Sequence, residues 1–297
     1  MNLFTTLHEL QAWRKAIIGT VGVVPTMGYL HAGHLSLVEA ASRENDYVVV
    51  TIFVNPTQFA ATEDLSSYPR DIEGDLKKLR DTGKVAVVFV PTAKEVYPRG
   101  FQTMITVERV SQGLEGASRP GHFVGVATVV CKLLNMTRAD KAYFGQKDAQ
   151  QVAVIRRMVA DLNMPIDIRI CPIMREQDGL AMSSRNAYLT PEQHNVSYIL
   201  YHALTSAAII YEAGIRDPEA LRDQIRHELE KEPLAQLDYV SVARADTLEE
   251  LQAETDTPYL LSLAVKIGKP RLLDNMLLPH YLNSIEGVSG VLGVAKV

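Results

Sequence analysis

Residues 20–41 read TVGVVPTMGYLHAGHLSLVEAA and contain the turn around which we expect the rest of the chain to fold. Residues 20–24 are apolar and rich in valine, which predicts a buried strand, whereas residues 35–41 are good helix formers. His31 and His34 therefore lie where a strand ends and a helix begins. In a parallel sheet, this position beside a helix N-terminus is where ligands bind.

The residue types in this turn suit a phosphate ligand. Gly28 and Gly33 let the backbone approach a bulky anion, and an imidazole can donate a hydrogen bond to a phosphate oxygen. A histidine near the start of a helix is more often a capping or surface residue than a catalytic one. The motif therefore indicates a phosphate site only if partner residues lie elsewhere in the chain.

The wider pattern predicts an α/β fold, in which a Rossmann-like doubly wound parallel sheet is followed by a smaller α+β domain. Strands and helices alternate over roughly the first 170 residues, which favours a parallel sheet with helices on both faces. Beyond the first strand, we expect strands at residues 47–54, 85–90, 101–107, 141–144 and 166–173. We expect helices at residues 1–17, 71–82, 126–136 and 149–162, and a glycine-rich loop at residues 113–125.

The pattern changes in the second part of the chain. Helices are expected at residues 191–213 and 218–231, and antiparallel strands at residues 237–243, 259–267 and 271–276. We therefore predict a first domain of residues 1–173, a second domain of residues 174–283 that acts as a lid hinged near residues 174–177, and a tail of residues 284–297.

Composition limits the function classes. The chain of 297 residues is 47% hydrophobic and carries a formal net charge of −5, without a long run of lysine or arginine, which argues against a nucleic-acid-binding surface. The two cysteines, Cys131 and Cys171, lie in apolar sequence, so we expect both to pack in the core and the protein to occupy a reducing cytoplasm. No apolar run in the sequence is long enough to span a membrane.

A second motif, Met182-Ser183-Ser184-Arg185, lies in the loop GLAMSSRN at residues 179–186. Its two hydroxyl groups can bind phosphate oxygens, and the guanidinium of Arg185 can bind them bidentately. Taken alone, the loop is equally consistent with a polar cap on the helix that follows.

The His-x-Gly-His and Ser-Ser-Arg motifs together resemble the HIGH and KMSKS signatures of the nucleotidyltransferase superfamily, which includes the class I aminoacyl-tRNA synthetases. Six ordered segments make the chain similar to the pantothenate synthetase (pantoate–β-alanine ligase) family up to about residue 282. These segments are PTMGYLHAGH (25–34), VNPTQF (54–59), YPRD (68–71), RPGHFVGVATVV (119–130), YFGQKDAQQ (143–151) and GLAMSSRN (179–186).

The resemblance implies a reaction and its participants. The reaction is the ATP-dependent condensation of pantoate with β-alanine to pantothenate, through a pantoyl-adenylate intermediate and with release of AMP and pyrophosphate. The resemblance further implies ATP and Mg²⁺ as cofactors, small-molecule substrates with no nucleic acid or membrane partner, and a cytoplasmic homodimer.

The resemblance also implies which residues act on the nucleotide. The implied catalytic residues are His34 as proton donor, with His31, Lys147 and Arg185 at the phosphates. The implied ATP-binding residues are Met27, Gly28, Tyr29, Leu30, His31, Ala32, Gly33, His34, Gly145, Gln146, Lys147, Asp148, Met174, Met182, Ser183, Ser184 and Arg185.

The remaining implied residues belong to the other substrates and the metal. Gln58 and Gln151 would hold pantoate, and Gln58 would also lie near β-alanine. Asp75 is a metal candidate, because the family associates this acidic segment with its metal ion. Further pocket residues would be Asn55, Tyr68 and Arg119.

The chemistry of these residue types agrees with this interpretation. Activation of a carboxylate by attack at the α-phosphate of ATP requires donors and cations around the phosphates, and the two motifs with Lys147 supply both. Two other function classes share the His-x-Gly-His turn. One is an adenylyltransferase that leaves the nucleotide on its product, and the other is a non-catalytic nucleotide-binding module or a synthetase fragment.

Overall fold

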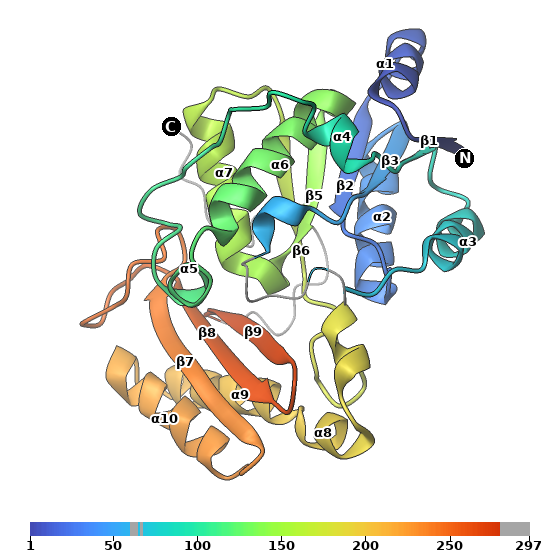
Figure 1. Cartoon of the computed structure of the whole chain (residues 1–297). Coiled ribbons are helices and arrows are strands. Elements are labelled where there is room, and N and C mark those ends of the chain that lie inside the picture. The colour runs from blue at the N-terminus through green and yellow to red at the C-terminus, as the bar shows by residue number, and fades with distance from the viewer. Residues whose placement is uncertain (60–64, 66–67, 280–297) are drawn as a thin grey trace. The chain divides into compact units, whose positions relative to one another are not determined.

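The computed structural model describes residues 1–59, 65 and 68–279, and the chain divides into two compact units (Figure 1). Unit 1 comprises residues 1–145 and 150–171, and unit 2 comprises residues 146–149 and the chain from residue 172 onward. A four-residue turn, Gln146–Ala149, therefore packs with unit 2 although it lies between a strand and a helix of unit 1. The predicted tail at residues 284–297 lies outside the described residues.

Unit 1 is built on a parallel sheet. In the described residues its strands pair in the order β1-β4-β3-β2-β5-β6, and every pairing is parallel. The strands are β1 (Asn2–Phe4), β2 (Val21–Thr26), β3 (Tyr47–Ile52), β4 (Val87–Phe89), β5 (Lys141–Gly145) and β6 (Asp167–Cys171). Successive residues of a strand point to opposite faces, and the neighbours Val23 and Val24 are both fully buried, so both faces of the sheet are covered. The predicted doubly wound parallel sheet is confirmed.

The helices of unit 1 pack their apolar residues onto this sheet. On one face, Leu37 and Val38 of the second helix and Leu79 of the third form a core cluster with Val50 and Val88 of the sheet. The helices and the first 3₁₀ turn are α1 (Leu7–Ala16), α2 (Ala32–Glu44), η1 (Pro56–Gln58), α3 (Ile72–Thr82), α4 (Ala93–Val96), α5 (Leu114–Ser118), α6 (His122–Thr137) and α7 (Ala149–Asp161).

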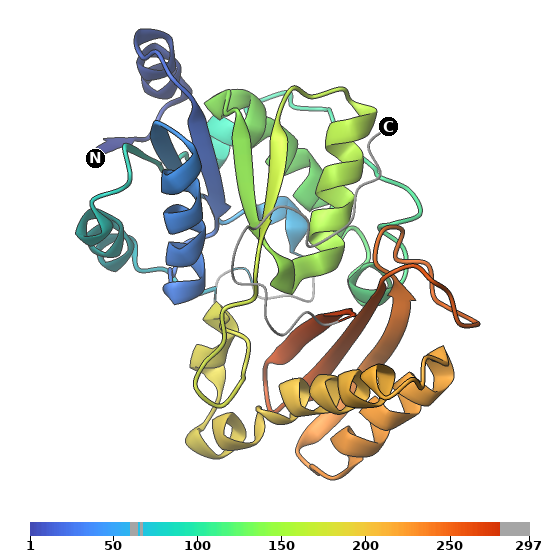
Figure 2. The same ribbon diagram turned by 180° about the vertical axis from the view of Figure 1, so that it is seen from behind.

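Unit 2 places two helices on one face of an antiparallel sheet, as Figure 2 shows from behind. Its sheet has the order β7-β8-β9, and Val242, Leu263 and Met276 from the three strands lie in the core beneath the helices. The elements of this unit are η2 (Gln146–Asp148), η3 (Ser184–Tyr188), α8 (Pro191–Val196), α9 (Ile199–Glu212), α10 (Pro218–Glu230), β7 (Ala235–Arg244), β8 (Tyr259–Ile267) and β9 (Arg271–Leu278).

Four sequence predictions about local structure were wrong. Residues 101–107 alternate in polarity but pair with no strand, and the Ile105 N–H instead donates to Oγ1 of Thr128. Residues 2–4, predicted as helix, form the short edge strand β1. The loop at residues 113–125 contains α5 and the start of α6. The single helix predicted at residues 191–213 is divided at Ser197, whose hydroxyl donates to the Gln193 carbonyl and ends α8.

The two cysteines are free thiols whose pKa values burial raises. Cys171 is 6% exposed, and burial raises the pKa of its thiol to about 11. Cys131 is partly buried within α6, and burial raises its pKa as well. Within the residues that the structure describes, no helix combines the length and apolar character needed to cross a bilayer.

We predict that Cys171 of the native protein resists alkylation by iodoacetamide at pH 8, because only a thiolate reacts and this thiol stays protonated well above that pH. Peptide mass spectrometry would measure the modified fraction, with the urea-unfolded chain as the fully reactive control. Rapid modification of Cys171 in the folded protein would contradict its assignment as a buried, unreactive thiol.

Candidate active site

The turn after β2 has a backbone that few residues adopt. Gly28 and Tyr29 both have positive φ, 88° and 54°. A Cβ atom at position 28 would lie 3.1 Å from Oδ2 of Asp75, so this position requires glycine for both conformation and space. The backbone N–H groups of Tyr29 and Leu30 both donate to the Asp75 carboxylate, each with an N···O distance of 2.7 Å. Successive N–H groups that converge in this way form an anion-binding nest, which here holds a side chain of the protein.

Asp75 is well suited to this anchoring role. It lies in the first turn of α3, where the helix dipole favours a negative charge, and its side chain is only 1% exposed. Lys78, 3.8 Å from Asp75, also donates to the Leu30 carbonyl at 2.8 Å. Both Asp75 oxygens thus hold the turn, a role that differs from the metal ligation suggested by the sequence. Among the residues that the structure describes, no group of three or more His, Cys, Asp or Glu side chains is placed to hold a metal ion.

The two histidines of the turn form a reciprocal cap at the start of α2. The N–H of Gly33 donates to Nδ1 of His31 at 3.2 Å, and the N–H of His31 donates to Nδ1 of His34 at 3.3 Å. A ring nitrogen that accepts a hydrogen bond carries no proton, so the neutral rings carry their proton on Nε2. The ring centroids lie 4.1 Å apart. Capping and ligand binding are therefore compatible, because capping uses Nδ1 and a phosphate would accept from Nε2.

The amide of Gln58 is buried and held at both ends. Its Nε2 donates to Sδ of Met27 at 3.0 Å, and its Oε1 accepts from Nδ2 of Asn55 at 3.2 Å. Asn55 also donates to the Gly125 carbonyl at 3.2 Å and accepts from the Tyr97 hydroxyl at 2.7 Å. Unit 1 therefore joins the predicted pantoate residue directly to the predicted ATP-binding turn.

The start of α6 fixes the backbone of the same segment. Nη1 of Arg119 lies 3.0 Å from Nε2 of His122, and Nδ1 of His122 lies 2.8 Å from the Gln58 carbonyl oxygen. This arrangement is consistent with an Nδ1–H donor to Gln58. The helix comes so close that a Cβ on Gly125 would lie 2.4 Å from the Thr57 carbonyl oxygen. His122 was missed as a site residue by the sequence analysis, although its RPGHF segment had been singled out.

Two neighbouring glutamines at the start of α7 have different surroundings. Gln151, predicted to hold pantoate, is partly buried. Gln150, which the sequence analysis passed over, is 5% exposed, and its Oε1 accepts from the Glu115 N–H at 2.9 Å. Its Nε2 donates, at 3.1–3.2 Å, to the carbonyl groups of Val110, Gln112 and Gly113. Gln150 therefore fixes the loop that leads into α5.

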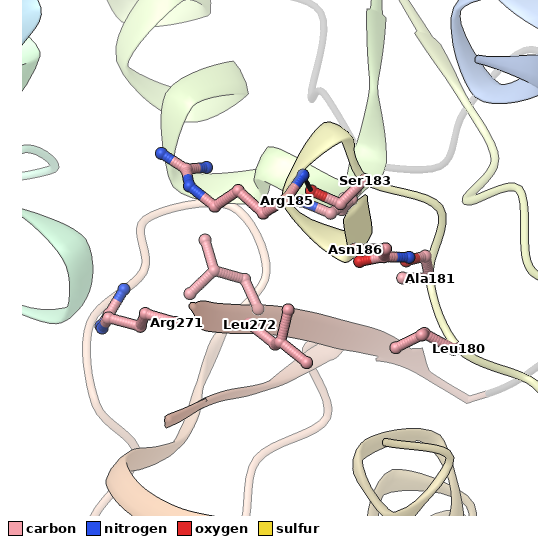
Figure 3. A pocket seen from close by; sticks show the side chains of 9 residues that line it. Leu180, Ala181, Ser183, Arg185, Asn186, Arg271 and Leu272 are labelled. Atoms are coloured by element: carbon pink, nitrogen blue, oxygen red, sulfur yellow. Dashed lines mark hydrogen bonds between the residues drawn. The ribbon is translucent and has the colours of Figure 1, made fainter. Parts of the chain in front are cut away.

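Unit 2 contains a small pocket surrounded by cationic and hydroxyl groups. Figure 3 shows Ser183 and Arg185 above β9, from which Arg271 and Leu272 project. The space between these side chains is about 250 Å³, which includes the part that is open to solvent. The residues that line it are Lys147, Leu180, Ala181, Ser183, Arg185, Asn186, Arg271, Leu272 and Leu273.

The segment before Ser183 is a hydrogen-bonded hairpin. The N–H of Met182 donates to the Met174 carbonyl at 2.9 Å, and the N–H of Glu176 donates to the Leu180 carbonyl at 2.8 Å. At its end, Ser183 caps η3 by accepting from the Arg185 N–H at 3.2 Å. These bonds tie the start of unit 2 to the Ser183–Arg185 loop, and the hinge predicted at residues 174–177 stays a prediction.

The structure thus groups the predicted site residues within each unit. Unit 1 holds the turn of residues 27–34, Gln58, Gly145 and Gln151. Unit 2 holds Gln146–Asp148, Met174 and residues 182–185, and it brings Lys147, Ser183 and Arg185 around one pocket. Arg271 in the same pocket was not predicted, because nothing in its local sequence distinguishes it from a surface arginine at a turn.

A family model described as pantoate-beta-alanine ligase matches residues 2–277. The chain belongs to the pantoate–β-alanine ligase family. A pantothenate synthetase from Roseiflexus sp. (strain RS-1) is 56% identical to this chain over 278 residues, which cover 94% of this chain and 99% of the relative. One from Herpetosiphon aurantiacus is 52% identical, with 94% of this chain and 100% of the relative covered.

Solved pantoate–β-alanine ligases have the same fold. A pantothenate synthetase from Thermus thermophilus is similar with a TM-score of 0.87 and 42% identity, covering 93% of this chain and 99% of that one. The ligase from Francisella tularensis was solved in complex with "Beta-gamma ATP" and β-alanine, and it is similar with a TM-score of 0.76 and 36% identity over 93% of this chain and 97% of that one. Family membership decides between the function classes in favour of the ligase.

We predict that Asp75→Asn lowers kcat/KM by about 100-fold, because an Asn amide nitrogen would face a backbone N–H and shift the His31–His34 turn by a fraction of an ångström or more. The unpaired buried N–H would also lower the free energy of unfolding by roughly 1–3 kcal/mol. Steady-state kinetics and urea unfolding would measure both effects.

The matched control for this variant is Asp81→Asn, at the exposed C-terminal end of the same helix, where Asp81 pairs only with Lys77 across the surface. We expect Asp81→Asn to change neither kcat/KM nor the free energy of unfolding measurably. If Asp75→Asn changed kcat/KM and the free energy of unfolding as little as Asp81→Asn does, Asp75 would have no role in positioning the turn.

Proposed function

We propose that this protein joins pantoate to β-alanine and converts ATP to AMP and pyrophosphate, with pantoyl-adenylate as the intermediate. The observation that carries the proposal is the match to the pantoate–β-alanine ligase family over residues 2–277. The pocket of unit 2 supports it, because three cationic side chains and a serine line the pocket and can donate to phosphate oxygens.

In the first step, a carboxylate oxygen of pantoate attacks the α-phosphorus of ATP, and the bond from that phosphorus to the pyrophosphate oxygen breaks. Lys147, Ser183 and Arg185 would donate to phosphate oxygens and stabilise the charge that develops on the leaving group. His34 would donate a hydrogen bond to a phosphate oxygen through Nε2–H, with His31 beside it, because Nδ1 of each ring accepts a backbone N–H in the cap of α2.

In the second step, the amine of β-alanine attacks the acyl carbon and AMP leaves, taking with it the oxygen that came from the pantoate carboxylate. Gln58 and Gln151 would hold pantoate by hydrogen bonds during both steps. Their neutral amides can read a hydroxyl and a carboxylate without the strong ion pair that would lower the nucleophilicity of the carboxylate. The contacts of Gln58 with Asn55 and Met27 support this role, since they fix the amide before any substrate arrives.

The remaining ATP contacts belong to the same proposal. Gly145, Gln146 and Asp148 would contact ribose and phosphates, and Met174 and Met182 would flank the adenine side, with Ser184 assisting the clamp. Mg²⁺, held by phosphate oxygens and water, would add charge neutralisation when bound. Asp75 stays the predicted protein ligand for Mg²⁺, although each of its two oxygens already accepts a backbone N–H. The homodimer and the cytoplasmic location stay predictions.

The adenylate route predicts the fate of one oxygen atom. With pantoate labelled with ¹⁸O in its carboxylate, we expect one ¹⁸O atom in each AMP formed and none in pyrophosphate. Mass spectrometry of the separated products would measure this, and reactions without pantoate or without β-alanine would serve as controls. Formation of ADP, or of AMP without the label, would contradict the mechanism.

The roles of His34 and Lys147 predict a second outcome. His34→Ala and Lys147→Ala should each lower kcat by about 10²–10³-fold while the chain stays folded, because each removes a donor to the phosphates in the transition state. Lys77→Ala, at an exposed site on α3, is the matched control and should keep full activity. Full turnover in either active-site variant would remove that residue from the mechanism.

A further inference from the structure

Two consecutive side chains of β9, Asp274 and Asn275, are buried polar groups, 2% and 3% exposed. Neighbouring residues of a strand point to opposite faces of the sheet. Asp274 shares the face of Leu272 and Met276, which pack in the core with α9 and α10. Asn275 therefore points to the other face, where Leu273 lines the pocket with Lys147.

Asn275 holds the turn that carries Lys147. Its Nδ2 donates to the carbonyl oxygens of Gln146 and Lys147 at 3.0 and 2.9 Å. Its Oδ1 accepts from Nε2 of Gln146 at 3.3 Å. The 3₁₀ turn η2 is only three residues long, so it cannot satisfy these carbonyl groups by itself. A carboxylate at position 275 would offer no donor and would repel both carbonyls.

Asp274 holds the hairpin that carries the Ser183–Arg185 loop. Its carboxylate accepts from Nη1 and Nη2 of Arg175 at 2.6 and 3.0 Å, a bidentate pair. Arg175 also donates to the Gly179 carbonyl at 3.0 Å, and its guanidinium lies 4.0 Å from the ring centre of Tyr201 on α9. Complete burial raises the pKa of Asp274, although the Arg175 hydrogen bonds oppose that rise.

We propose that Asp274 and Asn275 are positioning residues that set Lys147 and the Ser183–Arg185 loop around one phosphate-binding pocket. Lys147 and Ser183 are 36 residues apart in the chain, and β9 lies far from both in sequence, so two adjacent side chains on a rigid strand fix their relative position. The inference rests on the proposed role of this pocket in ATP binding. Positioning matters because a misplacement of about 1 Å in a catalytic group can cost about 100-fold in rate.

The proposal predicts specific coupling between pairs of residues. Asn275→Ala should lower kcat/KM for ATP by about 100-fold in the otherwise natural enzyme but by less than about threefold when Lys147 is already alanine, because Asn275 acts through Lys147. Asp274→Asn should likewise lower kcat/KM for ATP by about 100-fold in the otherwise natural enzyme but by less than about threefold when Arg185 is already alanine. KM for β-alanine should change little in all these variants. Double-mutant cycles on kcat/KM in the full-length enzyme would measure both couplings.

The matched control is Ser262→Ala on β8, because Ser262 is buried and pairs directly with Asn275 in the sheet register. It should leave kcat/KM for ATP near that of the natural enzyme. Thermal unfolding would be recorded for every variant, and Asn275→Ser, which keeps one donor, replaces Asn275→Ala if the alanine variant does not fold.

The positioning role would be overturned if the effects of the paired substitutions on kcat/KM for ATP were additive. It would also be overturned if Asn275 variants lost no more kcat/KM for ATP than Ser262→Ala does. Failure of the proposed function itself would be seen separately, as absence of AMP formation by the natural enzyme. The inference is supported only if the natural enzyme forms AMP and each β9 residue couples to its own loop and not to the other.

Discussion

The contact on which the account depends is the hydrogen bonding of the Asp75 carboxylate to the backbone N–H groups of Tyr29 and Leu30. Two successive positive φ angles aim these N–H groups at one point, and such a backbone persists only when something outside the turn stabilises it. The Asp75 carboxylate, buried at the first turn of α3, does so. The position of His31 and His34, and therefore of their Nε2 donors, follows from this contact.

The same physical solution recurs at the other reactive segments. Most of the predicted site residues lie in short turns, which cannot satisfy all of their own backbone groups. Each turn is held by a buried polar side chain from a regular element: Asp75 on α3, Gln150 on α7, and Asn275 on β9. These anchors are nearly inaccessible to solvent, so their hydrogen bonds do not compete with water. The polar groups of these turns are thus held by the fold itself, which would lower the cost of organising them in a transition state.

Much of the fold and part of the site follow from local sequence. Runs of valine identify β2 and β3, because a strand covered on both faces needs apolar side chains at every position. Lys147, Ser183 and Arg185 were predicted and line one pocket of unit 2. The prediction of a strand at residues 101–107 failed because alternating polarity indicates which side chains are covered and not whether a partner strand is present. The three-residue strand β1 is too short to show any period.

The anchors could not be predicted, because their partners are distant in the chain. Asp75 lies 46 residues from Tyr29, and Asn275 lies 129 residues from Gln146. A buried aspartate within a charged helix, or an asparagine within an apolar strand, has no local signature of its function. Only the folded chain shows which backbone groups they satisfy.

The most direct test of this account is amide hydrogen exchange in the unliganded protein, followed for individual residues by ¹⁵N NMR. The account predicts that the Tyr29 and Leu30 amides exchange as slowly as those of β2 and β3, because a buried carboxylate holds both in the absence of substrate. Exchange of these two amides at the rate of an open surface loop, with protection appearing only when ATP is added, would contradict it.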